Sequence, residues 1–383
     1  MWWSARTRRW CGASVATAFT ALLFGALTAA YATAATPPRH DALALGLQFR
    51  GQVIVPTGIT FRGTKVGGLS GLAHSVNETF YALSDDHKNP RFYKLRVRIS
   101  DGRLRPGDVA FESVTVLKRP DGTSYPPESL DPEGFALTKD KRRAIVTSEG
   151  FADRQIAPWI RAYKLDGSYV SDLPLDDAFI PDKAGKRGVR QNRGFESAAT
   201  VGRHFLTATE AALQQDGRLP TPWAGTPARV LRYRLVERKL ERQWTYMTDP
   251  IAGWPVPRTQ QATNGLADLL PVDDNRLIAL ERSFSFGASQ TGGYAIRLYL
   301  ADLANNGSTA KKLLFNLNVI GIPMDNIEAM AFGPRLADGR RTLLLVSDNN
   351  FSRSEITQFL LFTVDFATLS EGREWPSSPP AVG

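Results

Sequence analysis

The sequence repeats one hairpin pattern five times, and this repetition limits the fold more than any other feature of the chain. The pattern is clearest between Met324 and Asn350, in MDNIEAMAFGPRLADGRRTLLLVSDNN. A cluster of oxygen-bearing side chains precedes one apolar strand, a turn follows at Asp338-Gly339, and a second apolar strand runs into another polar cluster. Two apolar runs joined by such a turn are typical of a β-hairpin.

The five copies have a regular spacing. Their matching positions are Ser70, Glu133, Glu196, Asn264 and Glu328, which are separated by 63, 63, 68 and 64 residues. A steady period of this length, with several strands in each unit, is typical of a β-propeller. A second hairpin with alternating polar and apolar residues follows the first in each copy. We therefore predict an all-β fold, a β-propeller of four-stranded blades. Five blades are visible, and the long loops leave room for a sixth.

The N-terminal part of the domain contributes one additional strand. Residues Leu43 to Val55 form a predicted strand that has no partner within its own repeat. We expect it to complete the last blade, so that the propeller is closed by its N-terminal strand. The domain then spans residues 43–371, after a linker at residues 35–42. The Pro- and Ser-rich residues 372–383 are predicted to be a disordered tail.

Residues 1–34 are predicted to be a signal peptide. Arg6, Arg8 and Arg9 form a positive region, a run of apolar and small residues follows to Ala30, and Ala-x-Ala patterns supply a cleavage site. We expect export to the periplasm or the medium, by the Sec or the twin-arginine route. An uncleaved membrane anchor is the alternative. The apolar run is weakly hydrophobic for a stable span, so we expect none after cleavage.

Composition excludes several classes of protein. The single cysteine, Cys11, lies in the predicted signal, so the mature chain would have neither disulfides nor thiol catalysis. Without the three signal arginines, 44 basic residues stand against 38 acidic ones, a net charge of +6. This mild excess suits a small anionic substrate. The sequence has no basic run interleaved with aromatic residues, so we expect no nucleic-acid binding. The oligomeric state does not follow from the sequence.

Polar residues recur at two positions of each repeat. The first strand of each propeller blade lines the central channel, so the five matching positions would form a ring around it. A second set ends the second strand of each copy and comprises Asp85, Glu149, Glu210, Glu281 and Asp348. Clustered carboxylates repel one another unless a cation or a shared proton intervenes. Hard oxygen ligands in this number favour Ca²⁺, with Mg²⁺ as the alternative.

We predict a divalent metal site at these positions. The candidate ligands are Glu133, Glu196, Glu210, Asn264, Glu281, Glu328 and Asp348. The alternative is that they only bond backbone amides in turns, an explanation that is weaker for glutamate than for aspartate or asparagine. The face of the propeller that each set occupies does not follow from the sequence.

Two arginines keep fixed positions relative to the recurring acids. Arg193 lies three residues before Glu196, and Arg282 directly follows Glu281. Metal-bound acids with arginines nearby are the arrangement that hydrolysis of a phosphate ester requires. The candidate catalytic residues are Glu196, Glu328, Arg193 and Arg282.

Other chemistries find little support. The four histidines show no metal-ligand spacing, and the sequence around Ser70 misses the G-x-S-x-G pattern of a nucleophilic serine by one residue. No P-loop or dinucleotide fingerprint is present, so we expect no organic cofactor.

Several blocks of sequence resemble a known family. They are NGLADLLPVDDNRLIALERSFS (Asn264 to Ser285), IRLYLADL (Ile296 to Leu303), DNIEAMAFGPRLADGRRTLLLVSDNNF (Asp325 to Phe351), SLDPEGFAL and NRGFESAA. Together they are similar to the exported proteins called phytase-like, or "esterase-like activity of phytase", over roughly Gly67 to Asp365. The resemblance implies a β-propeller hydrolase acting on phosphate or other esters. The calcium-dependent propeller phytases hold metals with clustered acids and phosphate with basic residues. Their ligands do not map onto this chain residue by residue, and Ser70 leaves the ring of acids incomplete.

These observations predict an exported, metal-assisted hydrolase of phosphate esters. One alternative is a lactonase or carboxylesterase propeller, in which a divalent ion polarises a carbonyl group. Another is a non-catalytic ligand-binding propeller with structural calcium.

Overall fold

The computed structural model describes residues 46–288, 293–303 and 307–366. The chain divides into residues 1–40 and 41–383, and all described residues belong to the second unit. The predicted signal peptide, linker and C-terminal tail lie outside the described residues. Within the described ranges, no helix has the length and apolar character needed to cross a bilayer.

The described residues form five antiparallel sheets of four strands, which confirms the predicted all-β propeller with five blades. The first blade contains β4 (Leu69–His74), β5 (Thr79–Ser84), β6 (Arg91–Val97) and β7 (Val109–Val116). The second contains β8 (Pro132–Leu137), β9 (Arg143–Ser148), β10 (Trp159–Lys164) and β11 (Tyr169–Leu173). The third contains β12 (Ala199–Val201), β13 (His204–Ala208), β14 (Pro227–Arg234) and β15 (Lys239–Met247). The fourth contains β16 (Ala262–Pro271), β17 (Arg276–Ser285), β18 (Tyr294–Asp302) and β19 (Ala310–Asn316).

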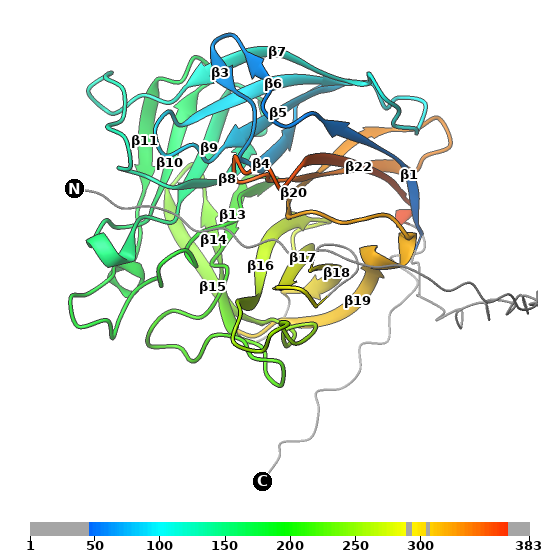
Figure 1. The fold of residues 1–383 in the computed structure, drawn as a ribbon. Coiled ribbons are helices and arrows are strands. Elements are labelled where there is room, and N and C mark those ends of the chain that lie inside the picture. The colour runs from blue at the N-terminus through cyan, green and yellow to red at the C-terminus, as the bar shows by residue number, and fades with distance from the viewer. Residues whose placement is uncertain (1–45, 289–292, 304–306, 367–383) are drawn as a thin grey trace, which may run out of the picture. The chain divides into compact units, whose positions relative to one another are not determined.

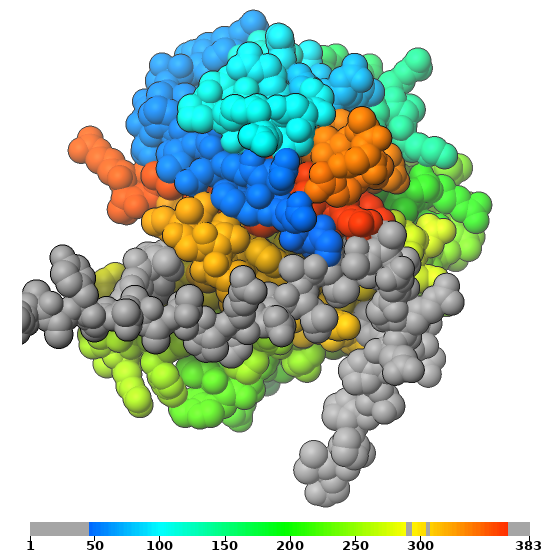
Figure 2. Space-filling view, turned by 90° about the vertical axis from the view of Figure 1, so that its right-hand side faces the viewer, coloured from blue at the N-terminus to red at the C-terminus, as the bar shows by residue number. Residues whose placement is uncertain are grey.

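The fifth blade combines strands from both ends of the described chain. It contains β20 (Ile327–Arg335), β21 (Arg341–Ser347), β22 (Thr357–Val364) and, on its outer edge, β1 (Leu47–Val55). Strand β1 runs antiparallel to β22, and Leu47 stands opposite Val364. Figure 1 shows β1, in blue, beside β22, and Figure 2 shows the blue start of the described chain lying against its red end.

Minor elements occupy the connections. A two-stranded ribbon of β2 (Thr60–Phe61) and β3 (Thr64–Lys65) precedes the first blade. Three short 3-10 helices are η1 (Ala152–Arg154), η2 (Asp177–Phe179) and η3 (Leu317–Ile320). No sixth four-stranded sheet is present among the described residues.

Small residues let the innermost strands approach one another closely. The first strands of the five blades contact one another in order, and β20 in turn contacts β4. A Cβ atom on Gly134 would lie 2.5 Å from the carbonyl carbon of Ser197, and one on Gly71 would lie 2.8 Å from the carbonyl oxygen of Glu133. Real side chains essentially never make such short contacts, so the glycine after the recurring polar residue permits the spacing at the axis.

The hydrophobic core lies between the blades. Five clusters of buried apolar side chains each join two neighbouring blades. The cluster between the fifth and first blades, for example, contains Leu344 and Phe359 together with Leu69 and Phe80. Because each sheet is covered on both faces, strands such as β22 are buried along their whole length. This packing fixes the positions of the strand ends, which carry the recurring polar residues.

Candidate functional site

Both sets of recurring polar residues lie at the same end of the channel. The first and second strands of each blade are antiparallel, so the start of one stands beside the end of the other. Leu69 is opposite Ser84, and Pro132 is opposite Ser148. The acids that follow the second strands therefore meet the residues that begin the first strands. We call this end of the channel the acidic end.

A cavity of about 330 Å³ opens at the acidic end. Its charged lining residues are Asp85, His87, Asp131, Glu133, Arg193, Glu196, Arg282, Glu328, Asp348 and Glu355. Seven carboxyl groups thus share the cavity with two guanidinium groups and one imidazole. Such an excess of carboxyl groups stabilises a bound cation. It disfavours the ionised form of each carboxyl group that has no cationic partner.

One side of this cavity contains the arginines. Arg193 Nη1 lies 2.8 Å from Oε2 of Glu210, and Arg282 Nη2 lies 3.0 Å from Oε1 of the same carboxylate. Arg282 Nη1 also lies 3.1 Å from Oε1 of Glu328 and donates a hydrogen bond to Oδ1 of Asn326 over 2.6 Å. Burial alone would lower the pKa of Arg282, but the negative charges of Glu328 and Glu210 raise it above its usual value. Arg282 is therefore a permanent cation that holds two buried carboxylates in place.

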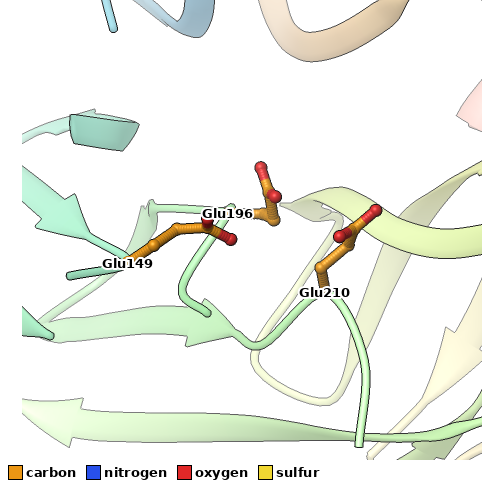
Figure 3. A group of neighbouring side chains, drawn as sticks. All are labelled: Glu149, Glu196 and Glu210. Carbon is orange, nitrogen blue, oxygen red and sulfur yellow. The ribbon is translucent and has the colours of Figure 1, made fainter. Parts of the chain in front are cut away.

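Glu196 lies next to this paired group. One carboxylate oxygen each of Glu149, Glu196 and Glu210 lies within 4.8 Å of the other two. Figure 3 shows Glu196 between the other two side chains. Glu149 accepts a hydrogen bond from the backbone N–H of Gly194 over 2.6 Å. Buried carboxylates this close to one another repel, which favours the protonated form of at least one of them.

The pKa values of Glu149 and Glu196 are both raised. Burial and the negative charge of Asp131 raise the pKa of Glu149 to about 8. Burial and the charges of Glu149 and Glu210 raise the pKa of Glu196 well above its usual range. The pair therefore keeps a proton at neutral pH, at a position that lines the cavity.

The opposite side of the cavity has acids without basic partners. Burial and the charge of Asp131 raise the pKa of Asp85 to about 7. Burial and the negative charge of Glu196 raise the pKa of Glu133. Burial and the negative charge of Asp85 raise the pKa of Asp348. Oδ1 of Asp85 is buried and has no hydrogen-bond donor among the described residues. This group, Asp85, Glu133 and Asp348, is named the unpaired acids below.

His87 forms an ion pair at the edge of the unpaired acids. Its Nε2 lies 2.6 Å from Oδ1 of the buried Asp131, and its Nδ1 lies 3.3 Å from Oε2 of Glu128. The hydrogen bond to Asp131 raises the pKa of His87 to about 9, so the imidazole is positively charged at neutral pH. Asp131 therefore has a cationic partner, whereas none of the unpaired acids forms an ion pair with a described residue.

The structure brings together most of the residues proposed from the sequence. Glu133, Glu196, Glu328, Asp348, Arg193 and Arg282 line one cavity, and Glu210 lies directly beside it. Asn264 and Glu281 do not line it. Asn264 Nδ2 donates to Glu281 Oε2 over 2.9 Å, and Glu281 also accepts from the hydroxyl of Tyr246 and the backbone N–H of Asp249. Lys311 pairs with Glu281 as well, so the partners of this acid come from the fourth blade and from the end of the third.

Several lining residues are not among the site residues predicted from the sequence, and Asp131, His87, Asn326 and Glu355 are four of them. The repeat contains a signal for three of them. Asp131 and Asn326 both stand two residues before a recurring glutamate, and His87 stands two residues after the acid that ends a second strand. Glu355 has no counterpart in the pattern, and it accepts a hydrogen bond from the hydroxyl of Tyr294 over 3.0 Å.

The unpaired acids have the chemistry of a hard-cation site. All their side-chain ligand atoms are oxygens, which suit Ca²⁺ and Mg²⁺ better than softer metals. A buried carboxylate oxygen without a donor, at Asp85, is the kind of atom that a cation would satisfy. The residues present therefore fit a divalent ion at this side of the cavity.

Comparisons with known proteins identify one family. A family model described as "Phytase-like: Esterase-like activity of phytase" matches residues 64–351. No curated protein matches the chain.

Solved structures offer only distant likenesses. The Dos1 propeller is 10% identical over 79% of this chain and 69% of its own, with a TM-score of 0.33. The WD40 β-propeller domain of Doa1 is 9% identical over 86% of this chain and 100% of its own, with a TM-score of 0.32. A protein from Lactobacillus plantarum is 13% identical over 80% of this chain and 83% of its own, with a TM-score of 0.38.

Proposed function

The chain belongs to the phytase-like family, and on that premise we propose that it is an exported enzyme that hydrolyses phosphate esters with the help of a divalent cation. The family supports a hydrolase-type propeller. The metal, the phosphate ester and the export are the parts that the proposal adds. One observation carries it: unpaired buried acids and two fixed arginines face each other across the same cavity.

The unpaired acids are assigned to the cation. Asp85, Glu133 and Asp348 come from three different blades and present oxygen atoms to one cavity. A divalent ion bound there would polarise a phosphoryl oxygen and lower the pKa of a bound water. Calcium is the preferred ion because it accepts many oxygen ligands in flexible geometry, whereas magnesium demands a near-ideal octahedron.

The arginines are assigned to the phosphate group. Arg193 and Arg282 line the cavity, and their shared contact with Glu210 fixes the direction of both guanidinium groups. Nε of Arg282 is buried and has no acceptor among the described residues. Planar guanidinium groups with spare donors suit the tetrahedral oxygens of phosphate. Glu210 and Glu328 are accordingly positioning residues in this proposal, and they act through the arginines.

The Glu149–Glu196 pair is assigned to proton transfer. Ester hydrolysis forms a bond from the water oxygen to phosphorus and breaks the bond from phosphorus to the alcohol oxygen. The departing oxygen gains a proton, and the attacking water loses one. A carboxyl pair that keeps one proton near neutral pH can donate it and later recover it, and Glu196 is the member that reaches the cavity.

The first test measures metal and activity in the same sample. We expect calcium in the purified protein, turnover of a chromogenic phosphate monoester, and loss of that turnover in a strong chelator with recovery on adding Ca²⁺. Glu133→Gln should reduce kcat on the order of 100-fold. The matched control is Glu112→Gln, because Glu112 forms a surface pair with Lys94 and Arg96 on an outer strand. Turnover that chelation leaves unchanged would reject the metal.

A panel of substrates separates the alternatives. The family description names an esterase-like activity, so a lactone and a carboxylic ester belong beside the phosphate ester. Metal-dependent turnover of the lactone alone would replace the phosphate assignment with a lactonase. A metal-free protein that turns over none of the three would favour a non-catalytic binding propeller.

Export has its own test. Fractionation of expressing cells should place the processed chain outside the cytoplasm, with a new N-terminus near residue 35. Replacement of Arg8 and Arg9 by lysine should block processing if the twin-arginine route is used and leave it unchanged if the Sec route is used. A full-length chain in the cytoplasm would contradict export.

A further inference from the structure

A second cavity, of about 310 Å³, lies at the other end of the channel. It is formed where the first strand of each blade turns into the second, so all five blades contribute. The contributing residues include His74, Lys141, Gly202, Val272 and Arg341. We call it the distal cavity. It shares no lining residue with the cavity at the acidic end.

The distal cavity combines an apolar wall with basic groups. Leu72, Phe135, Leu137, Met330 and Phe332 are among the apolar side chains that line it. Its charged or titratable lining residues are all basic: His74, Lys141 and Arg341. None of the described lining residues is an aspartate or a glutamate. A site that can bury an apolar group and offers only positive charge is complementary to an amphiphilic anion.

No acid among the described residues forms an ion pair with Lys141 or Arg341 at this cavity. Nζ of Lys141 donates to the backbone oxygen of His74 over 3.0 Å, and Nε of Arg341 donates to the backbone oxygen of Gly333 over 3.3 Å. The guanidinium of Arg341 lies 4.7 Å from the centre of the Phe332 ring. These contacts fix both side chains but leave their charges uncompensated.

The electrostatic surroundings of these two groups are cationic. Burial, and then the positive charge of Arg341, lower the pKa of Lys141. Burial, and then the charge of Arg335, lower the pKa of Arg341. Burial also lowers the pKa of His74, so this imidazole is neutral at pH 7 and can serve as a polar contact. An anion placed between two partly buried cations that repel each other stabilises both of them.

We propose that the distal cavity binds an organic anion with an apolar body, such as a medium-chain carboxylate. The carboxylate contacts Lys141 and Arg341, and the hydrocarbon lies against the apolar wall. The cavity volume is at the lower end of the usual range for small-molecule sites, so a ligand of roughly ten non-hydrogen atoms fits. This inference does not depend on the proposed hydrolysis, because the two cavities are separate.

Octanoate is the probe for this site, and calorimetric titration of the purified protein is the measurement. We expect saturable binding of octanoate with one site per chain, binding of octan-1-ol weaker by about tenfold or more, and no measurable binding of inorganic phosphate at the same concentrations. Equal affinity for octanoate and octan-1-ol would overturn the role of the cations. Tighter binding of phosphate than of octanoate would overturn the role of the apolar wall, and no binding of octanoate would overturn the site.

Variants assign the binding to this cavity. Lys141→Gln and Arg341→Gln should each weaken octanoate binding about fivefold or more. Arg341→Lys keeps the charge and should retain most of the affinity, and Arg142→Gln removes an exposed cation next to Lys141 and should change nothing. The melting temperature of each variant shows that it is folded. Equal losses in Lys141→Gln and Arg142→Gln would mean that octanoate responds to the overall charge and not to this cavity.

A truncated chain tests a competing occupant. Phe366, the last described residue, packs against Phe332 of the cavity wall at a ring distance of 5.3 Å. If a chain ending at Phe366 binds octanoate and the full chain does not, the C-terminal segment takes this cavity and the proposal is wrong. Equal affinity of the two chains supports an external anion.

Discussion

At one end of the channel, seven carboxyl groups line a cavity of about 330 Å³; at the other, three basic side chains and no described carboxylate line a cavity of about 310 Å³. The same ten strands connect the two cavities. In the second blade, for example, the start of β8 and the residue before it line the cavity at the acidic end, whereas the end of β8 and the turn after it line the distal cavity. A propeller can therefore set the charge of its two ends independently, without any change to the core between the blades.

The two ends also treat their charges differently. Arg282 at the acidic end contacts two carboxylates and an amide, whereas Arg341 at the distal end contacts a backbone oxygen and an aromatic ring. Arg282 thus compensates the charges of buried acids of the chain itself, whereas the proposed partner of Arg341 is the carboxylate of a bound ligand. Substitutions at the two ends should therefore change stability by different amounts.

Arg282→Gln should give the largest loss of stability. It leaves Glu210 and Glu328 buried without their shared cation, and removal of one partner from a buried ion pair costs about 3–5 kcal/mol of the free energy of unfolding. Denaturant unfolding measures this change. Arg96→Gln, which breaks a surface pair with Glu112, is the control and should cost no more than about 1 kcal/mol. A cost as small as that of the control would show that the acidic end does not depend on Arg282.

The pH dependence of stability should come from the buried acids at the acidic end, among them Asp85 and Glu149. The folded pKa of Asp85 is about 7 and that of Glu149 is about 8, both above their values in an unfolded chain. Raised pKa values mean that the folded state binds more protons, so in the presence of chelator the free energy of unfolding should fall as pH rises from 4 to 8. Thermal melting across this range measures the fall.

Asp85→Asn tests the origin of that slope. The amide cannot ionise, so the variant should be more stable than the parent chain at pH 8 in chelator, by about 1–3 kcal/mol, and equal to it near pH 4. Calcium should stabilise the parent at pH 8 more than the variant, because Asp85 is an assigned ligand. An unchanged slope in Asp85→Asn would move the titration to other acids.

Lys141→Gln should have the smallest effect. It removes a partly buried cation with no acid partner, so the free energy of unfolding without ligand should change by less than about 1 kcal/mol. The same measurement in octanoate should reveal the difference, since the parent chain gains stability from the ligand and the variant does not. A loss above about 2 kcal/mol without ligand would show that Lys141 is a structural residue.

The sequence was sufficient to predict the blades. The fivefold pattern predicted the number of blades and their four strands each, because buried strands have continuous apolar runs and outer strands alternate. The long connections at residues 174–198 and 248–261 contain no additional four-stranded sheet, although the length of the loops left room for one. The length of a loop alone therefore does not indicate an additional sheet.

The candidate site was only partly predictable. Glu133 and Glu281 occupy polar positions of the same pattern, yet Glu133 faces the cavity and Glu281 faces Lys311 and Tyr246. Lys311 comes from the outer strand of the fourth blade and Tyr246 from the outer strand of the third, and the repeat gives no information about these contacts. Glu355 is absent from the pattern altogether. A repeat predicts where a side chain starts, but the neighbours that it meets depend on loops that differ between copies.

The mixed origin of the fifth blade has a consequence for synthesis of the protein. Strand β1 ends at Val55, and its partner β22 begins at Thr357, so a growing polypeptide carries β1 without its partner until residues 357–364 have been synthesised. Such an unpaired strand attracts other strands and promotes aggregation. An incomplete chain that ends before β22 therefore exposes β1 as a site that chaperones and proteases can recognise.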